Sequence, residues 1–300
     1  MAGSDADRWI AARRLAGVAI MATAIALGGA VAQAQTSPAD NARAVAPADL
    51  TGYWVSVITE DWRVRMLTPP VGEVAGVPVN QEGMKAAQQW QPETDIAAGE
   101  QCRPFGAAGI MRMPVRLHVS WQDERTLKVE IDNGQQIRLF HFDAAGEAPA
   151  SPSWQGVSVA KWETLGQAVG QASIAPVVAG QAQGGGGVTG QAAARAALAR
   201  QRSPALSGSL QVVTTQMRPG YLRRNGVPYS EHAVLTEFFD RMTASNGDEW
   251  LILTSTVNDP KYLSIPYVLT SQFRKESDGS KFNPRPCAIT PPTPGPAVPQ

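Results

Sequence analysis

The chain has 300 residues, of which 43% are hydrophobic and 17% charged, and its 26 basic side chains are balanced by 26 acidic ones. This balance leaves no electrostatic footprint for nucleic acid or for an anionic membrane surface, so we expect neither as a partner. Only three histidines and two cysteines are present, and no two histidines have the spacing that places imidazoles on one ion. We therefore predict no metal site and no cofactor.

Residues 1–34 have the pattern of a signal peptide: a basic start, an apolar run too short for a comfortable membrane span, and small residues at Ala32 and Ala34 for cleavage. We predict a periplasmic or secreted protein without a membrane span after cleavage. The adjacent Arg13 and Arg14 leave twin-arginine export as the alternative to general secretion.

The two cysteines, Cys102 and Cys287, both follow the predicted signal peptide. Because oxidising compartments favour disulfides, we expect a bond that ties the early part of the domain to its end. Two unpaired structural thiols are the alternative. Neither cysteine has another Cys or His nearby at ligand spacing, which argues against a metal or catalytic role.

Three segments differ from the rest in composition. Residues 35–48 are predicted to be a flexible lead-in, and the Pro-rich residues 289–300 a disordered tail. Residues 165–208, rich in Gly, Ala and Gln, have too little apolar bulk for a core, so we interpret them as a low-complexity insert. The remainder of 49–288 has the size of a single domain.

Strand patterns dominate this domain. Asn133-Gly134 and Asn246-Gly247 are typical of tight turns between strands. One short helix is predicted at 82–90, with Asn80 as its N-cap. Strands are predicted within 49–58 and at 115–121, 127–131, 136–142, 156–163, 210–217, 233–242, 250–257 and 267–274. These patterns predict an all-β, mainly antiparallel domain of about nine strands, either an up-and-down barrel or a strongly curled sheet.

Two resemblances bear on this fold. Gly52-x-Trp54 resembles the opening signature of lipocalins and the wider calycin barrels, which implies a calycin-like barrel. Five blocks resemble a family of uncharacterised secreted bacterial proteins: DLTGYW at 49–54, GEQC at 99–102, PSWQG at 152–156, RPGYLRRNGVPY at 218–229 and VNDPKY at 257–262. That family has no established activity, so the resemblance implies no catalytic residues.

The densest mixture of charged and aromatic residues follows the first strand. If that strand continues to Arg65, then Asp61 and Arg63 share the face of Tyr53 and lie at the mouth of a cavity, where they would bind the polar end of a ligand. An exposed Asp–Arg pair at a strand end is the alternative.

Arg116 and His118 lie on one face of the second strand. If this face points inward, they form a polar strip inside the barrel, and if it points outward they are solvated. His141 has the parity of Ile137 and Leu139, which is typical of a half-buried, hydrogen-bonded residue and also makes it a candidate ligand contact.

The loop that contains Tyr221, Arg223, Arg224 and Tyr229 either covers a barrel opening or forms a surface turn. The composition of the loop favours neither placement.

A closed sheet commonly encloses a small-molecule cavity, so we predict an exported protein that binds a small, largely apolar molecule. A cofactor-free hydrolase, lyase or isomerase in the same cavity is the alternative, with Asp61 and His118 as the acid–base pair and Arg63 or Arg116 stabilising an anion. A cell-envelope interaction module is the third hypothesis. The sequence leaves open the ligand, the oligomeric state and whether the protein is an enzyme.

Overall fold

A computed structural model describes residues 41–143, 151–164 and 208–295. The predicted signal peptide lies outside these residues, as do the start of the lead-in, nearly all of the insert and the last part of the tail. The described end of the lead-in contacts the barrel: Ala42 is fully buried, and its carbonyl oxygen accepts a hydrogen bond from Nε1 of Trp162 at 2.9 Å.

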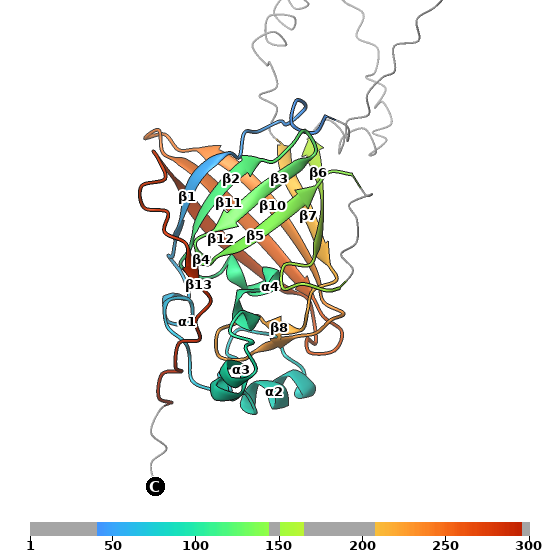
Figure 1. Cartoon of the computed structure of the whole chain (residues 1–300), viewed down its shortest axis with the longest axis vertical. Helices are drawn as coiled ribbons and strands as arrows, with labels where there is room; N and C mark the ends of the chain where they lie inside the picture. The colour runs from blue at the N-terminus through green and yellow to red at the C-terminus, as the bar shows by residue number, and fades with distance from the viewer. Residues whose placement is uncertain (1–40, 144–150, 165–207, 296–300) are drawn as a thin grey trace, which may run out of the picture. The chain divides into compact units, whose positions relative to one another are not determined.

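Nine strands close into a barrel in the described part of the chain (Figure 1). Each strand is hydrogen-bonded to the next one along the chain, and the last pairs with the first to close the ring. The strands are β1 (Gly52–Val57), β2 (Arg116–Trp121), β3 (Thr126–Ile131), β5 (Gln136–His141), β6 (Val157–Thr164), β7 (Gly208–Thr215), β10 (Val234–Thr243), β11 (Glu249–Asn258) and β12 (Tyr267–Glu276). The prediction of an up-and-down barrel of about nine strands is confirmed.

One neighbouring pair, β5 and β6, runs parallel: Phe140 is opposite Ser158, and His141 is opposite Val159. A closed ring with an odd number of strands cannot alternate direction all the way round, so at least one pair must be parallel. The other pairs in the ring are antiparallel. A parallel pair cannot be joined by a tight hairpin, and residues 142–156 supply the longer connection that it needs.

The barrel interior is filled mainly with apolar side chains, which alternate with outward-pointing residues along each strand. Trp54, Leu117, Phe140, Phe239 and Phe273 are each no more than 2% exposed and belong to one continuous cluster. The cavity left among these side chains is about 10 Å³, which is hardly enough for one water molecule. The expectation of an interior that is open to a guest is not met, since side chains occupy that space.

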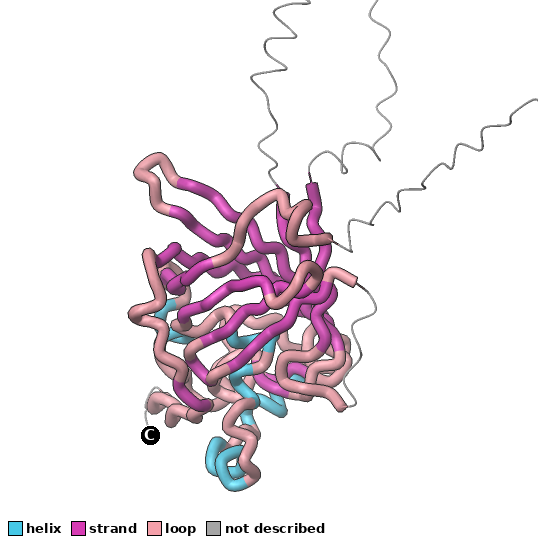
Figure 2. The backbone as a smooth tube through the Cα atoms, turned by 45° about the horizontal axis from the view of Figure 1, so that its top comes forward, coloured by secondary structure: helices cyan, strands magenta, loops and turns pink. Residues whose placement is uncertain are grey.

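Short helices gather at one end of the barrel (Figure 2). They are α1 (Trp62–Met66), α2 (Gln81–Gln88), α3 (Pro92–Ala97), the 3₁₀ helix η1 (Arg103–Phe105) and α4 (Ala107–Ile110). All of α4 is buried, and Phe105 and Ile110 join the interior cluster, so η1 and α4 close this end of the barrel.

The predicted helix is confirmed as α2, with the side chain of Asn80 accepting a hydrogen bond from the backbone N–H of Gly83 at 2.9 Å. The other helices were not predicted. In particular, the first strand ends at Val57 and residues 62–66 form α1, so the continuation of that strand to Arg65 was wrong. None of the helices in the described ranges is long and apolar enough to cross a membrane.

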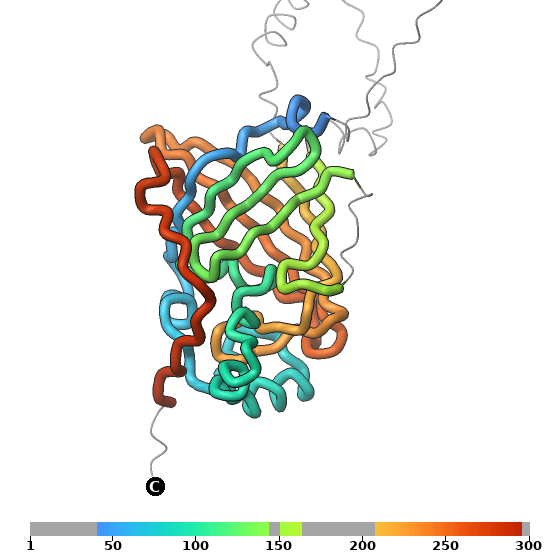
Figure 3. Tube along the Cα trace, in the orientation of Figure 1, coloured from blue at the N-terminus to red at the C-terminus, as the bar shows by residue number. Residues whose placement is uncertain are grey.

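Two pairs of two-residue strands lie outside the barrel wall. β8 (Gly220–Tyr221) and β9 (Pro228–Tyr229) form a hairpin, and β13 (Arg285–Pro286) pairs in parallel with β4 (Asn133–Gly134). From β13 the chain continues along the outside of the molecule (dark red in Figure 3), and the backbone N–H of Thr293 donates to the carbonyl oxygen of Thr68.

The predicted disulfide is confirmed. Cys102 and Cys287 are bonded, with an S–S distance of 2.01 Å and a Cα–Cα distance of 5.2 Å. The bond joins the segment before η1 to the segment after β13, and it fits a protein of an oxidising compartment.

Candidate functional site

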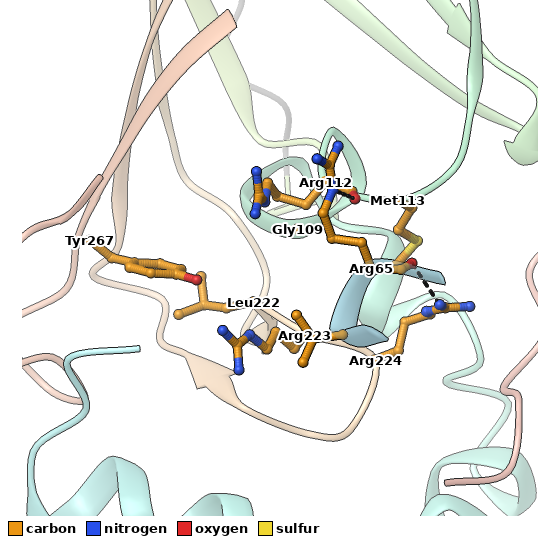
Figure 4. Close-up of a pocket in the computed structure, with 9 residues that line it drawn as sticks. Arg65, Gly109, Arg112, Met113, Leu222, Arg223, Arg224 and Tyr267 are labelled. Atoms are coloured by element: carbon orange, nitrogen blue, oxygen red, sulfur yellow. Dashed lines mark hydrogen bonds between the residues drawn. The ribbon is translucent and has the colours of Figure 1, made fainter. Parts of the chain in front are cut away.

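A cavity lined by four arginines lies at the helical end of the barrel (Figure 4). It is formed where α1, the C-terminal end of α4 and the β8–β9 loop meet the first residue of β12. Its volume is about 20 Å³. The lining residues are Val64, Arg65, Gly109, Arg112, Met113, Leu222, Arg223, Arg224 and Tyr267.

Arg65 is 3% exposed and comes from α1. Its Nε donates to the carbonyl oxygen of Arg112 at 2.9 Å (dashed in Figure 4), and its Nη1 donates to Glu60 at 2.9 Å. Its Nη2 is buried and has no hydrogen-bond acceptor among the described residues. A buried charged donor without an acceptor lowers the stability of the folded protein. None of the described residues supplies an acceptor for this nitrogen, so a bound group that accepts a hydrogen bond there would be stabilising.

Arg112 follows α4 and connects the cavity to the start of α1. Its Nη1 donates to Glu60 at 3.2 Å and also to the carbonyl oxygen of Thr270, and its Nη2 donates to Asp61 at 2.9 Å. Asp61 has a φ of 52°, in the left-handed region that few non-glycine residues adopt. The ion pair with Arg112 holds this strained residue at the edge of the cavity.

The β8–β9 loop supplies the other two arginines. Nη2 of Arg224 donates to the carbonyl oxygens of Arg65 and Leu67 at 2.8 and 3.0 Å, which fixes the loop against α1. Nη1 of Arg223 is buried, and no described residue accepts a hydrogen bond from it. The loop also packs closely on α4, because a Cβ at Gly109 would lie only 2.6 Å from the carbonyl oxygen of Tyr221.

Burial and mutual repulsion disfavour the positive charges in this cavity. Burial lowers the pKa of Arg65 to about 10, with help from the neighbouring charge of Arg112 and against the opposing effect of Glu60 and Asp61. Burial also lowers the pKa of Arg224. Both side chains stay protonated at neutral pH, so the folded protein holds cations where water solvates them poorly. An anion in the cavity would relieve this cost.

Glu60 partly compensates the arginines. Burial by itself raises the pKa of Glu60, but the hydrogen bond from Thr59 and the charges of Arg65 and Arg112 bring that pKa below its usual value. Glu60 is therefore ionised at neutral pH. The same carboxylate contacts the guanidinium groups of Arg65 and Arg112, whereas no carboxylate among the described residues pairs with Arg223 or Arg224.

Of the predicted site residues, Asp61 alone lies at this cavity, through its ion pair with Arg112. Arg63 does not line the cavity: its side chain is 60% exposed and pairs with Glu73 at 2.7 Å. The exposed-pair alternative thus describes Arg63, although its partner is Glu73 rather than Asp61.

Tyr53, Arg116 and His118 lie on the outer face of the barrel, because their neighbours Trp54 and Leu117 point inward. The rings of Tyr53 and His118 stack with centroids 4.3 Å apart. Nδ1 of His118 is 2.8 Å from Glu130, and Nε of Arg116 is 3.0 Å from Glu276. The outward alternative for this strand face is therefore the one observed.

His141 is half-buried next to the parallel β5–β6 pairing. Asp61 and His118 share neither a hydrogen bond nor a cavity in the described part of the chain. The geometry required of the predicted acid–base pair is therefore not assembled.

A wider groove lies on the other side of α1. It is about 410 Å³, and it is lined by Val55, Ser56, Ile58, Trp62, Met66, Pro114, Val115, Arg116 and Asp132. Trp62 and Met66 are 62% and 49% exposed. This groove has the apolar lining and the size of a small-molecule site, outside the barrel rather than within it.

The arginines that define the cavity were mostly missed from the sequence. Arg65 belongs to the dense charged stretch, and Arg223 and Arg224 to the loop of undecided placement, but nothing in the sequence connects these segments. No motif or residue pattern around Arg112 indicated that it belongs to a site. A count of arginines near glycine-containing turns would have marked each segment as a candidate for anion binding. It would not have shown that the segments meet in the fold.

Within the three described ranges, no group of three or more His, Cys, Asp or Glu side chains is arranged to hold a metal ion. Comparison of the chain with protein-family models, with curated proteins and with solved structures finds no match.

Proposed function

We propose that this protein is an exported small-molecule binding protein and that it holds an anionic group of its ligand in the arginine cavity. One observation carries the proposal: Arg65 and Arg223 both line this cavity, and each has a buried guanidinium nitrogen, Nη2 of Arg65 and Nη1 of Arg223, for which no acceptor exists among the described residues. Hydrogen bonds between guanidinium groups and anions are among the strongest in proteins. A cavity of about 20 Å³ suits a charged head group, with the rest of the ligand outside.

Export rests on the signal-like N-terminus and on the disulfide, and the resemblance to a family of secreted bacterial proteins agrees with it. A binding role is better supported than catalysis, because Asp61 and His118 do not meet and guanidinium groups are poor proton acceptors at neutral pH. A role as an envelope interaction module draws no support from the geometry of the described residues.

A largely apolar ligand has a second candidate location, the groove beside Trp62. A tryptophan that is 62% exposed in an apolar groove favours a neutral apolar compound there. The cavity among the interior side chains of the barrel is about 10 Å³, which is too small for such a compound.

The test is to measure thermal unfolding of the full chain against a panel of inorganic anions, small carboxylates and neutral apolar compounds. We expect anions to raise the unfolding midpoint. Arg223→Gln should weaken anion binding by about tenfold or more, since a hydrogen bond to a charged group contributes about 1.5–3 kcal/mol. Without anions, the same variant should unfold at a higher temperature than the wild type, because it removes a partly buried positive charge whose Nη1 has no acceptor among the described residues.

Arg63→Gln is the matched control, since Arg63 is a neighbouring arginine with its own partner, Glu73. This variant should bind anions nearly as well as the wild type. The proposal fails if no anion stabilises the protein, or if both arginine variants bind anions equally. Stabilisation by neutral apolar compounds that is lost in Trp62→Ala would instead place the ligand in the outer groove.

A further inference from the structure

Another groove lies at the helical end of the barrel, among α2, α3 and the β8–β9 hairpin (Figure 1). Its volume is about 420 Å³, within the range of about 300–1,000 Å³ that is usual for small-molecule sites. It shares no lining residue with the arginine cavity. We call it the polar groove, and the lining residues that matter most are Gln89, Trp90, Asp95, Arg103, Tyr221 and Tyr262.

One buried carboxylate fixes several side chains of the polar groove. Asp95 of α3 is 3% exposed, and its Oδ2 accepts hydrogen bonds from Nε1 of Trp90 at 2.8 Å and from the hydroxyl of Tyr221 at 2.7 Å. Its Oδ1 accepts a hydrogen bond from Nη1 of Arg103 at 2.7 Å. Because these bonds hold the side chains in place before a ligand arrives, binding would cost little side-chain entropy.

The charges of the polar groove disfavour a charged ligand. Arg103 pairs with Asp95, so the two ionised lining residues cancel each other. The guanidinium carbon of Arg103 also lies 4.7 Å from the ring centroid of Tyr221, and Nζ of Lys261 lies 5.2 Å from that of Tyr262. A cationic ligand would meet like charges at both tyrosines, and an anionic ligand would compete with Asp95 for Arg103.

The aromatic rings disfavour a flat, stacked ligand. The rings of Trp90 and Tyr221 have centroids 6.0 Å apart and meet at 71°, an edge-to-face arrangement. A planar base stacks on the face of an aromatic ring, and these two rings offer no parallel pair of faces. A sugar ring is puckered and surrounded by C–H and O–H groups, so it can contact aromatic side chains that meet at an angle.

The polar groove also offers hydrogen-bonding groups of both kinds. Gln89 is exposed, and its side chain makes no hydrogen bond to another described residue, so its amide offers donors and an acceptor. The side chain of Arg103 is 31% exposed, and its Nη1 alone is engaged by Asp95, so further donors remain. Sugar hydroxyls both donate and accept hydrogen bonds, and they can use both residues.

We infer that the polar groove is a second binding site and that it binds a neutral sugar unit. Gln89 and Arg103 bond to the hydroxyls, while the aromatic side chains contact the C–H groups. This site goes beyond the proposed function, since neither site needs the other.

The experiment measures binding to the full chain by saturation-transfer NMR titration with glucose, N-acetylglucosamine and their β-1,4-linked disaccharides. Adenosine, a flat base, and choline, a cation, are the comparison ligands. We expect the best sugar to bind about tenfold or more tightly than either, the effect of one or two additional hydrogen bonds. If single sugars bind as tightly as disaccharides, the ligand is a free sugar, and if only disaccharides bind, it is a glycan chain; either result supports the inference.

Gln89→Ala provides the second readout. It should weaken sugar binding about fivefold, the loss of one neutral hydrogen bond of about 1 kcal/mol, and leave stabilisation by sulfate at the arginine cavity unchanged. Gln81→Ala is the matched control, because Gln81 is an exposed glutamine of the same helix that does not line the groove. This control should bind sugars as the wild type does.

The inference is overturned if no sugar binds, if adenosine or choline binds more tightly than every sugar, or if the two glutamine variants bind sugars equally. None of these results bears on anion binding, which the anion panel tests separately at the arginine cavity.

Discussion

At the scale of single residues, the polar pair inside the barrel is the least expected feature. Arg138 and Glu237 have side-chain exposures of 0% and 1%, and two hydrogen bonds of 3.0 and 2.5 Å join them. The hydroxyl of Thr214 also accepts a hydrogen bond from Arg138, and it bonds in turn to Ser158. A buried pair of this kind contributes little net stability over apolar residues, but loss of one partner leaves an uncompensated buried charge.

We therefore expect Arg138→Met to lower the free energy of unfolding by about 3–5 kcal/mol, because Glu237 is left buried and unpaired. The double variant with Glu237→Leu should recover most of this loss. Denaturant unfolding measures both. Lys161→Met is the control: it breaks an exposed pair with Glu163 and should cost less than about 1 kcal/mol. A double variant that is destabilised by the sum of its two single changes would contradict this account.

At the scale of elements, the β8–β9 loop determines whether the cavity exists. Nδ2 of Asn225 donates to the carbonyl oxygens of Pro70 and Glu73, each at 2.9 Å. Gly226 has a φ of +80°, and a Cβ there would overlap the side chain of Trp90. The loop therefore adopts a conformation that glycine permits. It is held between the segment before α2 and Trp90, which lies in the link between α2 and α3, and this placement brings Arg223 to the cavity.

Gly226→Ala should lower the free energy of unfolding by about 2–4 kcal/mol, from the left-handed backbone and from the overlap with Trp90 together. It should also weaken sulfate binding, because the loop must move. Gly247→Ala separates the two effects: its φ is +87°, but no atom lies within 4 Å of the added Cβ. That variant should lose only about 1–2 kcal/mol and bind sulfate normally. Equal losses in both variants would show that contact with Trp90 is unimportant.

At the scale of the whole molecule, the barrel is a packed core that supports sites on its outside. The interior cluster includes side chains from every strand of the ring and also from the segments that close its ends. The arginine cavity lies at the helical end, where α4 fills the opening and the β8–β9 loop packs on α4. Ligand binding at this end requires no opening of the sheet.

Removal of one large interior side chain should therefore create space that the native barrel lacks. Phe239 is 2% exposed, and Phe239→Ala should lower the free energy of unfolding by about 3–5 kcal/mol while the folded variant gains a site for a neutral apolar dye. Val268→Ala, at a residue that is 59% exposed, should change stability by less than about 0.5 kcal/mol. The opposite result would be that the wild-type protein binds the dye, that Trp62→Ala still binds it, and that a larger side chain in the barrel interior abolishes binding. That result would show that the native barrel binds a small molecule inside.

Much of the fold could be predicted from local patterns. The nine barrel strands follow apolar–polar alternation, the Asn80 cap follows from its amide beside a helical stretch, and the disulfide follows from two cysteines in an exported chain. The α1 helix was missed because Trp62, Arg63 and Arg65 also fit a continued strand. An alternating pattern does not show where a strand loses its hydrogen-bonded neighbours and ends.

The candidate site was much less predictable. Alternation divides β2 into two faces but does not state which face is inside, so Arg116 and His118 were compatible with a lining role until Leu117 and Trp54 were seen to fill the interior. Arg65, Arg112 and Arg223 come from segments that are far apart in sequence, and each alone resembles a surface charge.

The sequence by itself determined the class of fold, the strand order and the covalent crosslink, because these depend on the periodicity of neighbouring residues and on which residue types are present. Tertiary structure alone decided the parallel β5–β6 pair, the filled interior and the meeting of four arginines. These features depend on closure of the sheet and on contacts between distant segments, where burial removes water from charges that would otherwise be solvated singly.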